Sequence, residues 1–124
     1  YGRTYAAAGD ATLATVPIGY ADGYPRCFSN RAEMLVNGRR APVTGRVCMD
    51  QCMLDVSDMT DVREGMVVTV FGRDGGASLP VEEFAALSGT INYESICLIG
   101  KRVPRIFQSG GRTVGQLNYI VPED

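Results

Sequence analysis

The segment that decides the fold class of this chain is Glu33-Met34-Leu35-Val36-Asn37-Gly38-Arg39-Arg40-Ala41-Pro42-Val43. Two short, mainly apolar runs, residues 33–36 and 40–43, flank the dipeptide Asn37-Gly38. Both residues of this dipeptide tolerate positive φ, which a tight turn between antiparallel strands requires. The segment therefore predicts a β-hairpin and places the chain among mainly β proteins.

Further short apolar runs, separated by glycine-containing turns, occur along the rest of the chain. They predict strands over residues 13–18, 47–56, 66–71, 93–99, 103–107 and 113–121. Residues 80–87 instead carry apolar side chains at near-helical spacing, with Ser78 as a candidate cap and Gly89 after the last turn. We expect seven or eight strands in a closed or nearly closed β-barrel, with one short helix near residues 80–88.

Composition limits the chemistry that this chain can perform alone. Its 124 residues, 45% hydrophobic and 21% charged, are typical of one folded domain. The sequence has no His, which excludes Ser-His and Cys-His nucleophile pairs and His-containing zinc sites within the chain. Its formal net charge of −2 argues against general nucleic-acid binding.

The cysteines and the apolar runs indicate the compartment. Cys48 and Cys52 would lie roughly 13 Å apart on the predicted strand, too far for a disulfide, and one loose pair is a weak zinc signal. We expect no metal site, and buried free thiols in a reducing, cytoplasmic compartment. The apolar runs are shorter than the ~20 residues of a membrane span, and no signal peptide is seen. The first residue is Tyr1 rather than Met, so we expect the chain to be part of a longer protein.

Two motifs follow predicted strands or lie on them. Residues 19–26 (Gly-Tyr-Ala-Asp-Gly-Tyr-Pro-Arg) read as a surface loop in which Asp22 forms a turn, or as a binding loop whose tyrosines and arginine suit a small anion. Residues 45–53 place Asp50 on an apolar strand face with Cys48 and Cys52. A charge there needs a partner, so we expect an arginine beside Asp50, in a structural ion pair or at a site.

Two later motifs have similar alternatives. Residues 90–94 (Thr-Ile-Asn-Tyr-Glu) predict the entry of a strand with Tyr93 half-buried, or a Tyr93 hydroxyl that donates to a phosphate or carboxylate. Residues 101–105 (Lys-Arg-Val-Pro-Arg) are a weak signal for nucleic acid and more typical of a solvated edge protected by Pro104.

Taken in order, these motifs resemble the C-terminal domain of bacterial alanine racemase. The resemblance rests on Tyr1-Gly2, Val16-Pro17-Ile18-Gly19-Tyr20-Ala21-Asp22-Gly23, Gly45-Arg46-Val47-Cys48-Met49-Asp50-Gln51, Thr90-Ile91-Asn92-Tyr93-Glu94 and Arg102-Val103-Pro104-Arg105. It covers residues 1–107, which we expect to form the C-terminal β domain. Residues 108–124 match no motif and are expected to form an extension with a further strand.

The resemblance implies an enzyme that interconverts L- and D-alanine and supplies D-alanine for peptidoglycan. In that family, an N-terminal (β/α)₈ barrel holds pyridoxal 5′-phosphate through a Schiff-base lysine. The C-terminal domain completes the site of the partner subunit in a head-to-tail homodimer. Such a barrel needs about 250 residues, so it is absent from this chain, and the resemblance does not place the cofactor lysine at Lys101.

The resemblance also implies a role for each motif residue. Tyr1 matches the catalytic tyrosine that exchanges the Cα proton, and Tyr93 matches the tyrosine that binds the cofactor phosphate. The Met49 N–H matches the donor to the substrate carboxylate. The residues that match the substrate entrance are Tyr20, Arg26, Arg46 and Asp50.

Several expectations and alternatives follow. We expect the chain alone to fold without racemising alanine, and Tyr1 to be mobile as a terminal residue. Serine is an alternative substrate, and a pyridoxal-phosphate decarboxylase of basic amino acids is an alternative enzyme. The alternative from another class is a non-catalytic β-barrel module for binding or dimerisation.

Overall fold

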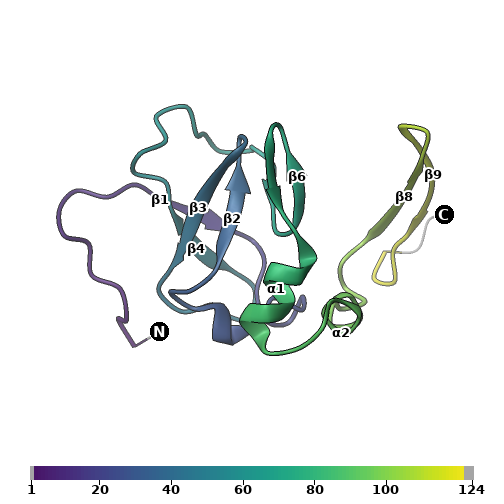
Figure 1. The fold of residues 1–124 in the computed structure, drawn as a ribbon, viewed down its shortest axis with the longest axis horizontal. Helices are drawn as coiled ribbons and strands as arrows, with labels where there is room; N and C mark the ends of the chain where they lie inside the picture. The colour runs from purple at the N-terminus through teal and green to yellow at the C-terminus, as the bar shows by residue number, and fades with distance from the viewer. Residues whose placement is uncertain (1, 122–124) are drawn as a thin grey trace.

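A computed structural model describes residues 2–121, and its central element is a curled antiparallel sheet (Figure 1). The strand order is β1-β4-β3-β2-β5, and every neighbouring pair is antiparallel. The strands are β1 (Leu13–Val16), β2 (Glu33–Val36), β3 (Arg39–Thr44), β4 (Cys52–Asp55) and β5 (Val68–Thr69). The predicted mainly β, barrel-like fold is confirmed, but the closed or nearly closed barrel of seven or eight strands is wrong, because this sheet has five strands and is open between β1 and β5.

The predicted hairpin at residues 33–43 is confirmed in detail. Val36 pairs with Arg39, and the two turn residues, Asn37 and Gly38, have φ values of 49° and 73°. Both dihedrals lie in the left-handed region that a two-residue hairpin turn needs. The local sequence therefore sets the register of β2 against β3.

The sheet forms an open half-barrel, with β1 and β5 as its two edges. An open cavity of about 430 Å³ is bordered by both edge strands, and its lining includes five valines, Val16, Val36, Val56, Val62 and Val68. β5 is only two residues long, so the strand predicted over residues 66–71 is wrong in extent. The chain turns at Gly72, whose φ is 129°, and continues into a separate hairpin of β6 (Gly72–Asp74) and β7 (Ala77–Leu79).

An aromatic cluster packs two helical segments against the half-barrel. Phe28 ends the 3₁₀ segment η1 (Arg26–Phe28), and Phe84 lies on α1 (Val81–Ser88). Their ring centroids are 4.6 Å apart, Tyr24 lies 5.0 Å from Phe28, and both contacts are edge-to-face. Such pairs add about 0.5–1.5 kcal/mol each beyond area burial. The core therefore fixes the position of η1.

The helix predicted near residues 80–88 is confirmed, but its first residue is capped differently. Pro80 occupies the N-cap position without a side-chain cap bond, so the prediction of a Ser78 cap is wrong. Gly89 closes the helix in the left-handed conformation at φ 76°, as its position after the last turn predicts.

The strand predicted over residues 93–99 is wrong, because residues 92–97 form the helix α2 (Asn92–Cys97). Ser95 is buried, and its hydroxyl donates to the Ile91 carbonyl at 3.1 Å. Within residues 92–99, the less exposed positions are Asn92, Ser95 and Ile99. Their spacing of three and four residues suits a helix. Packing against α1 thus overrides the strand preference of the tyrosine and isoleucines.

The last two strands form a hairpin that stands away from the half-barrel (Figure 1). They are β8 (Arg105–Ser109) and β9 (Arg112–Leu117), each displaced from the predicted ranges 103–107 and 113–121. Gly110 and Gly111, at φ 56° and 74°, make the turn that their sequence predicts. No helix within residues 2–121 is both long and apolar enough to cross a bilayer.

All four cysteines are free, but they differ in accessibility. Cys52 is buried, and burial, followed by the nearby Cys48, raises its pKa to about 12. Cys27 and Cys97 are exposed, so the expectation of buried thiols is wrong for these two. Their positions, on η1 and at the end of α2, lie outside the β core.

A thiol-labelling experiment tests this arrangement. At pH 8 we expect Cys27 and Cys97 to react rapidly with a disulfide reagent, and Cys52 to react only in denaturant. The raised pKa keeps the Cys52 thiol protonated, and the thiolate is the reactive form. Peptide mapping by mass spectrometry identifies the labelled residues. Fast labelling of Cys52 in the native chain would contradict the buried position.

Candidate functional site

The 19–25 loop, which follows β1, lies directly on the 45–51 loop, which precedes β4. The Tyr20 N–H donates to the Cys48 carbonyl and the Ala21 N–H to the Met49 carbonyl, both at 3.0 Å. A β-carbon added at Gly19 would lie 2.2 Å from the Cys48 oxygen and 2.4 Å from the Met49 oxygen. Only glycine therefore permits this approach of the two backbones.

Asp22 is a buried carboxylate at the centre of this contact, with 8% of its surface exposed. Its Oδ2 accepts the Gly19 N–H at 2.8 Å, and its Oδ1 accepts the Arg102 Nε–H at 2.6 Å. Asp22 thus forms the predicted turn with Gly19, but its carboxylate is buried and orders the loop from inside.

Arg102 bridges the two loops, because its guanidinium also donates to Asp50 Oδ1. The bonds to Asp50 and then to Asp22 raise the pKa of Arg102, which stays charged. The predicted arginine partner of Asp50 is therefore confirmed. Arg105 donates to the Ile99, Gly100 and Val103 carbonyls. Residues 101–104 are mostly exposed, as predicted, but they form a turn before β8 rather than the edge of a strand.

Residues 48–51 form a turn, so the strand predicted over residues 47–56 is wrong in its first half. The Cys48 N–H donates to the Gln51 carbonyl at 2.9 Å, and β4 begins only at Cys52. Met49 is 49% exposed, and its N–H meets no acceptor among residues 2–121. The turn borders an open depression of about 500 Å³, and the Met49 N–H is one of the backbone donors that stay free beside it within residues 2–121.

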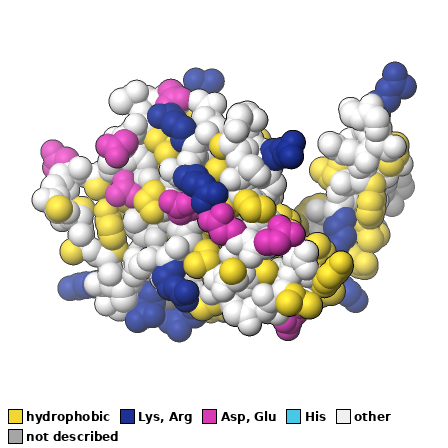
Figure 2. Space-filling model, in the orientation of Figure 1, with side chains coloured by type: hydrophobic (Ala, Val, Ile, Leu, Met, Phe, Trp, Pro, Cys, Tyr) yellow, Lys and Arg dark blue, Asp and Glu magenta, His cyan; other side chains and the backbone are white. Residues whose placement is uncertain are grey.

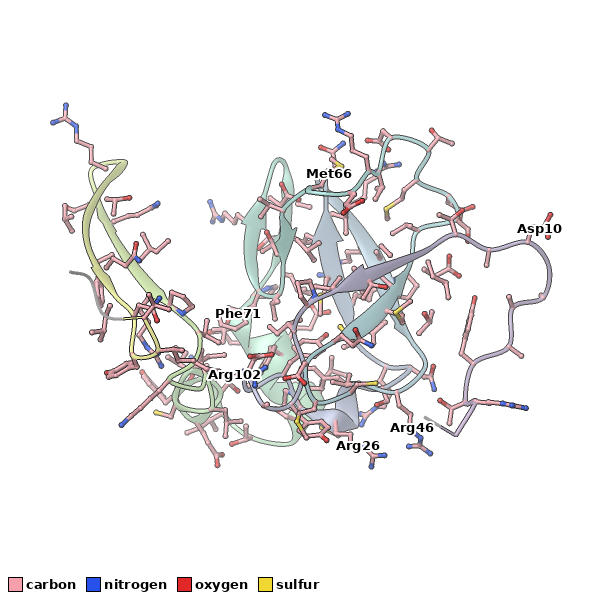
Figure 3. The ribbon with its side chains drawn as sticks, turned by 180° about the vertical axis from the view of Figure 1, so that it is seen from behind. Asp10, Arg26, Arg46, Met66, Phe71 and Arg102 are labelled. Atoms are coloured by element: carbon pink, nitrogen blue, oxygen red, sulfur yellow. The ribbon has the colours of Figure 1, made fainter. Side chains whose placement is uncertain are left out.

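Arginines gather at the same end of the molecule. Figure 3 shows Arg26, Arg46 and Arg102 at one end of the half-barrel, away from Asp10 and Met66. In Figure 2, one group of Lys and Arg side chains lies at the lower left of the displayed face, and others lie at its top and centre. Arg102 is paired with two carboxylates, whereas Arg26 and Arg46 have no carboxylate partner within residues 2–121, so these two arginines suit this end to an anionic ligand.

α2 is joined to the 19–25 loop at its C-terminal end. The Gly100 N–H donates to the Asp22 carbonyl at 2.9 Å, and a β-carbon at Gly23 would lie 2.3 Å from the Leu98 oxygen. Tyr93 on α2 is 75% exposed, not half-buried as predicted, and its hydroxyl has no hydrogen-bond partner among the described residues.

The structure thus brings together the loops that carry most of the predicted site residues. Tyr20, Arg26, Arg46, Met49 and Asp50 lie on three adjoining segments, and Tyr93 lies on a helix packed against one of them. Tyr1 lies outside the described residues.

Sequence reasoning missed two organising contacts, Asp22 with Arg102 and Asn30 with Thr4. The partners lie 80 and 26 positions apart, so no local pattern could reveal them.

Comparison with known proteins relates the whole chain to one family. The family model described as "Alanine racemase, C-terminal domain" matches residues 1–107. Alanine racemase 1 of Clostridium acetobutylicum is 44% identical over 97% of this chain and 31% of its own length. The alanine racemase of Desulfovibrio desulfuricans is 53% identical over 86% of this chain and 28% of its own.

Solved structures agree with the sequence matches. The alanine racemase of Bacillus anthracis with bound L-Ala-P superposes with a TM-score of 0.90 at 46% identity, covering 97% of this chain and 30% of that one. The Bartonella henselae enzyme, solved with covalently bound pyridoxal phosphate, has a TM-score of 0.73 at 32% identity, covering 81% of this chain and 27% of that one. This chain spans about a third of the length of these relatives. It belongs to the alanine racemase C-terminal domain family.

Proposed function

We propose that this chain is the C-terminal domain of a pyridoxal-phosphate-dependent alanine racemase that interconverts L- and D-alanine and so supplies D-alanine for peptidoglycan. The observation that carries the proposal is the superposition on an alanine racemase over 97% of the chain, at 46% identity. The motif residues also gather at one end of the half-barrel, beside a free backbone donor.

The residues present suit one side of a cofactor site. The Tyr93 hydroxyl is exposed and unpaired within residues 2–121, so it is available to donate to a phosphate oxygen. Lys101 is the only lysine of the chain, and its ammonium lies 5.5 Å from the Tyr119 ring centroid. We therefore assign the cofactor lysine to an N-terminal (β/α)₈ barrel, with this domain facing the barrel of a partner subunit in a head-to-tail homodimer.

Met49 and Asp50 are the residues that we assign to the substrate. The unpaired Met49 N–H would donate to the substrate carboxylate, a charge-assisted bond that holds the amino acid in one orientation. Arg102 holds Asp50 and therefore the turn that presents this donor. The residues assigned to the substrate entrance are Tyr20, Arg26, Arg46 and Asp50.

Tyr1 would exchange the Cα proton of the substrate. Racemisation requires proton removal on one face and proton return on the other, so two groups must act from opposite sides. The bound cofactor supplies an electron-withdrawing ring that stabilises negative charge at Cα. A tyrosine has an ordinary pKa of about 10, so it accepts a proton near neutral pH only beside positive charge.

A chimeric enzyme tests this function. Residues 1–124 replace the matching C-terminal segment of the Clostridium acetobutylicum relative. We expect the chimera to bind pyridoxal phosphate, to racemise alanine faster than serine and to rescue a strain that requires D-alanine. Tyr1→Phe should lower kcat by about 10²–10⁴-fold, because it removes one proton-transfer group.

Two results would contradict the proposal. One is a folded, cofactor-loaded chimera without activity, which would favour the non-catalytic binding or dimerisation module. The other is function of residues 1–124 without the barrel, detected either as racemisation with added pyridoxal phosphate or as cofactor attached to Lys101 after borohydride reduction.

A further inference from the structure

Asn30 has an unusual backbone conformation directly after η1. Its φ is 57°, and among residues 2–121 only two other non-glycine residues, Arg3 and Asn37, have positive φ. Asparagine tolerates the left-handed region better than most residues, at a modest energetic cost. This cost must be offset by the contacts that the conformation permits.

The side-chain amide of Asn30 uses both of its ends. Its Oδ1 accepts the Gly45 N–H at 2.6 Å. Its Nδ2 donates to the Thr4 hydroxyl at 3.1 Å and lies 3.4 Å from the Thr4 carbonyl oxygen. Asn30 therefore joins the 45–51 loop to the N-terminal arm, which we define as residues 2–12.

The neighbouring Ser29 completes the contact on the loop side. Its hydroxyl donates to the Arg26 carbonyl at 2.6 Å and accepts the Val47 N–H at 2.9 Å. The N–H groups on both sides of Arg46 are thus held by consecutive side chains. A β-carbon at Gly2 would lie 3.3 Å from Arg46 Nε, so the arm passes directly beside this guanidinium.

Asn30 follows a segment that is firmly packed in the core, whereas the N-terminal arm has few other attachments. Phe28, two residues before Asn30, is 1% exposed and packs in the aromatic cluster. The arm is otherwise held by the Tyr5 hydroxyl, which donates to Asp55 at 2.9 Å, and by backbone contacts of Thr12. Thr4 follows Tyr1 by three positions in the sequence, so the bonds of Asn30 hold the arm close in the chain to Tyr1.

We propose that Asn30 is a positioning residue that holds the N-terminal arm beside Arg46 and thereby restricts the position of the Tyr1 side chain during proton transfer. This inference rests on the proposed function for its catalytic meaning. The physical part, that Asn30 orders the arm, stands on the contacts alone. Misplacement of a catalytic group by about 1 Å can cost as much as 10²-fold in rate, so two hydrogen bonds to the arm have a measurable kinetic effect.

The test compares Asn30→Gly with Asn37→Gly. Glycine accepts positive φ, so both changes remove an exposed amide without imposing backbone strain. Asn37 lies in the β2–β3 turn and bonds to Asp61, away from the arm. In residues 1–124 labelled with ¹⁵N, we expect Asn30→Gly to lower the heteronuclear NOE of the Gly2–Tyr5 amides, while Asn37→Gly leaves it unchanged.

Enzyme kinetics of the active chimera provide the second part of the test. Asn30→Gly should lower kcat about 10-fold and change KM for alanine less than twofold, whereas Asn37→Gly should change neither beyond twofold. Thr4→Val, which removes only the hydroxyl acceptor, should give an intermediate loss. A merely structural role would lower the amount of active enzyme, which cofactor titration measures separately.

The outcomes separate the two proposals. Unchanged Gly2–Tyr5 NOE values in Asn30→Gly overturn the ordering role whatever the chimera does. Altered NOE values with unchanged kcat overturn the positioning role. An inactive parent chimera overturns the proposed function, and altered NOE values would then still support the ordering of the arm by Asn30.

Discussion

Replacing Gly19 with Ala is expected to destabilise the chain by about 3 kcal/mol and to abolish activity of the chimera. The added methyl group would lie 2.2 Å and 2.4 Å from two carbonyl oxygens, those of Cys48 and Met49. Both oxygens accept hydrogen bonds from the 19–25 loop, so the backbones must separate and these bonds must break. Overpacking of this kind costs about 1–3 kcal/mol, and more where the backbone itself must move.

Gly9→Ala is the matched control for this change. A β-carbon at Gly9 meets no atom within 4 Å, and the residue has no positive φ. Its effect should stay within about 0.5 kcal/mol. Urea denaturation followed by circular dichroism measures the unfolding midpoint of both variants. The midpoint of Gly19→Ala should fall while its m-value stays unchanged. Equal midpoints for Gly19→Ala and Gly9→Ala would contradict the close approach of the two loops.

Replacing Phe28 with Ala is expected to lower the free energy of unfolding by about 3–5 kcal/mol, because it removes a buried ring and leaves a cavity. Phe28 is 1% exposed and contacts two other rings edge-to-face. A domain with a total stability of about 5–15 kcal/mol loses a large part of it. Since Phe28 also anchors the turn before Asn30, heteronuclear NOE values of the N-terminal arm should fall as well.

Phe107→Ala provides the corresponding control on β8. This ring is 51% exposed on the hairpin that stands away from the half-barrel. Its removal should cost less than about 1 kcal/mol, because little surface is lost from the core. A loss as large as that of Phe28→Ala would show that the hairpin packs into the main core, against the arrangement described.

Local sequence signals predicted the elements that depend on neighbouring residues. Asn37-Gly38 specified a turn with two positive φ values, and the spacing of apolar residues over 80–88 specified α1. The same reasoning failed at α2, where apolar residues and a tyrosine favour a strand in isolation. Contact with α1 decides the helix there, since helix stability in proteins comes mainly from tertiary packing.

The candidate site also has features that local sequence predicts and features that only the folded chain reveals. The motif containing Met49 and Asp50 was found from its residue types, and an arginine partner for Asp50 was expected from the cost of an unpaired charge. Its identity as Arg102, and the burial of Asp22 beside it, needed the folded chain.

The sequence by itself determined the mainly β class, the central hairpin, the short helix α1 and the motifs that relate the chain to alanine racemases. These depend on residue types within a few positions, where backbone preference and spacing suffice. Only the tertiary structure decided that Asp22 meets Arg102 and that Asn30 meets Thr4, across 80 and 26 positions. The physical reason is that no local backbone preference or residue spacing indicates which distant polar groups will pair. They form because burial of the apolar core brings distant segments together and leaves their polar groups only each other as partners.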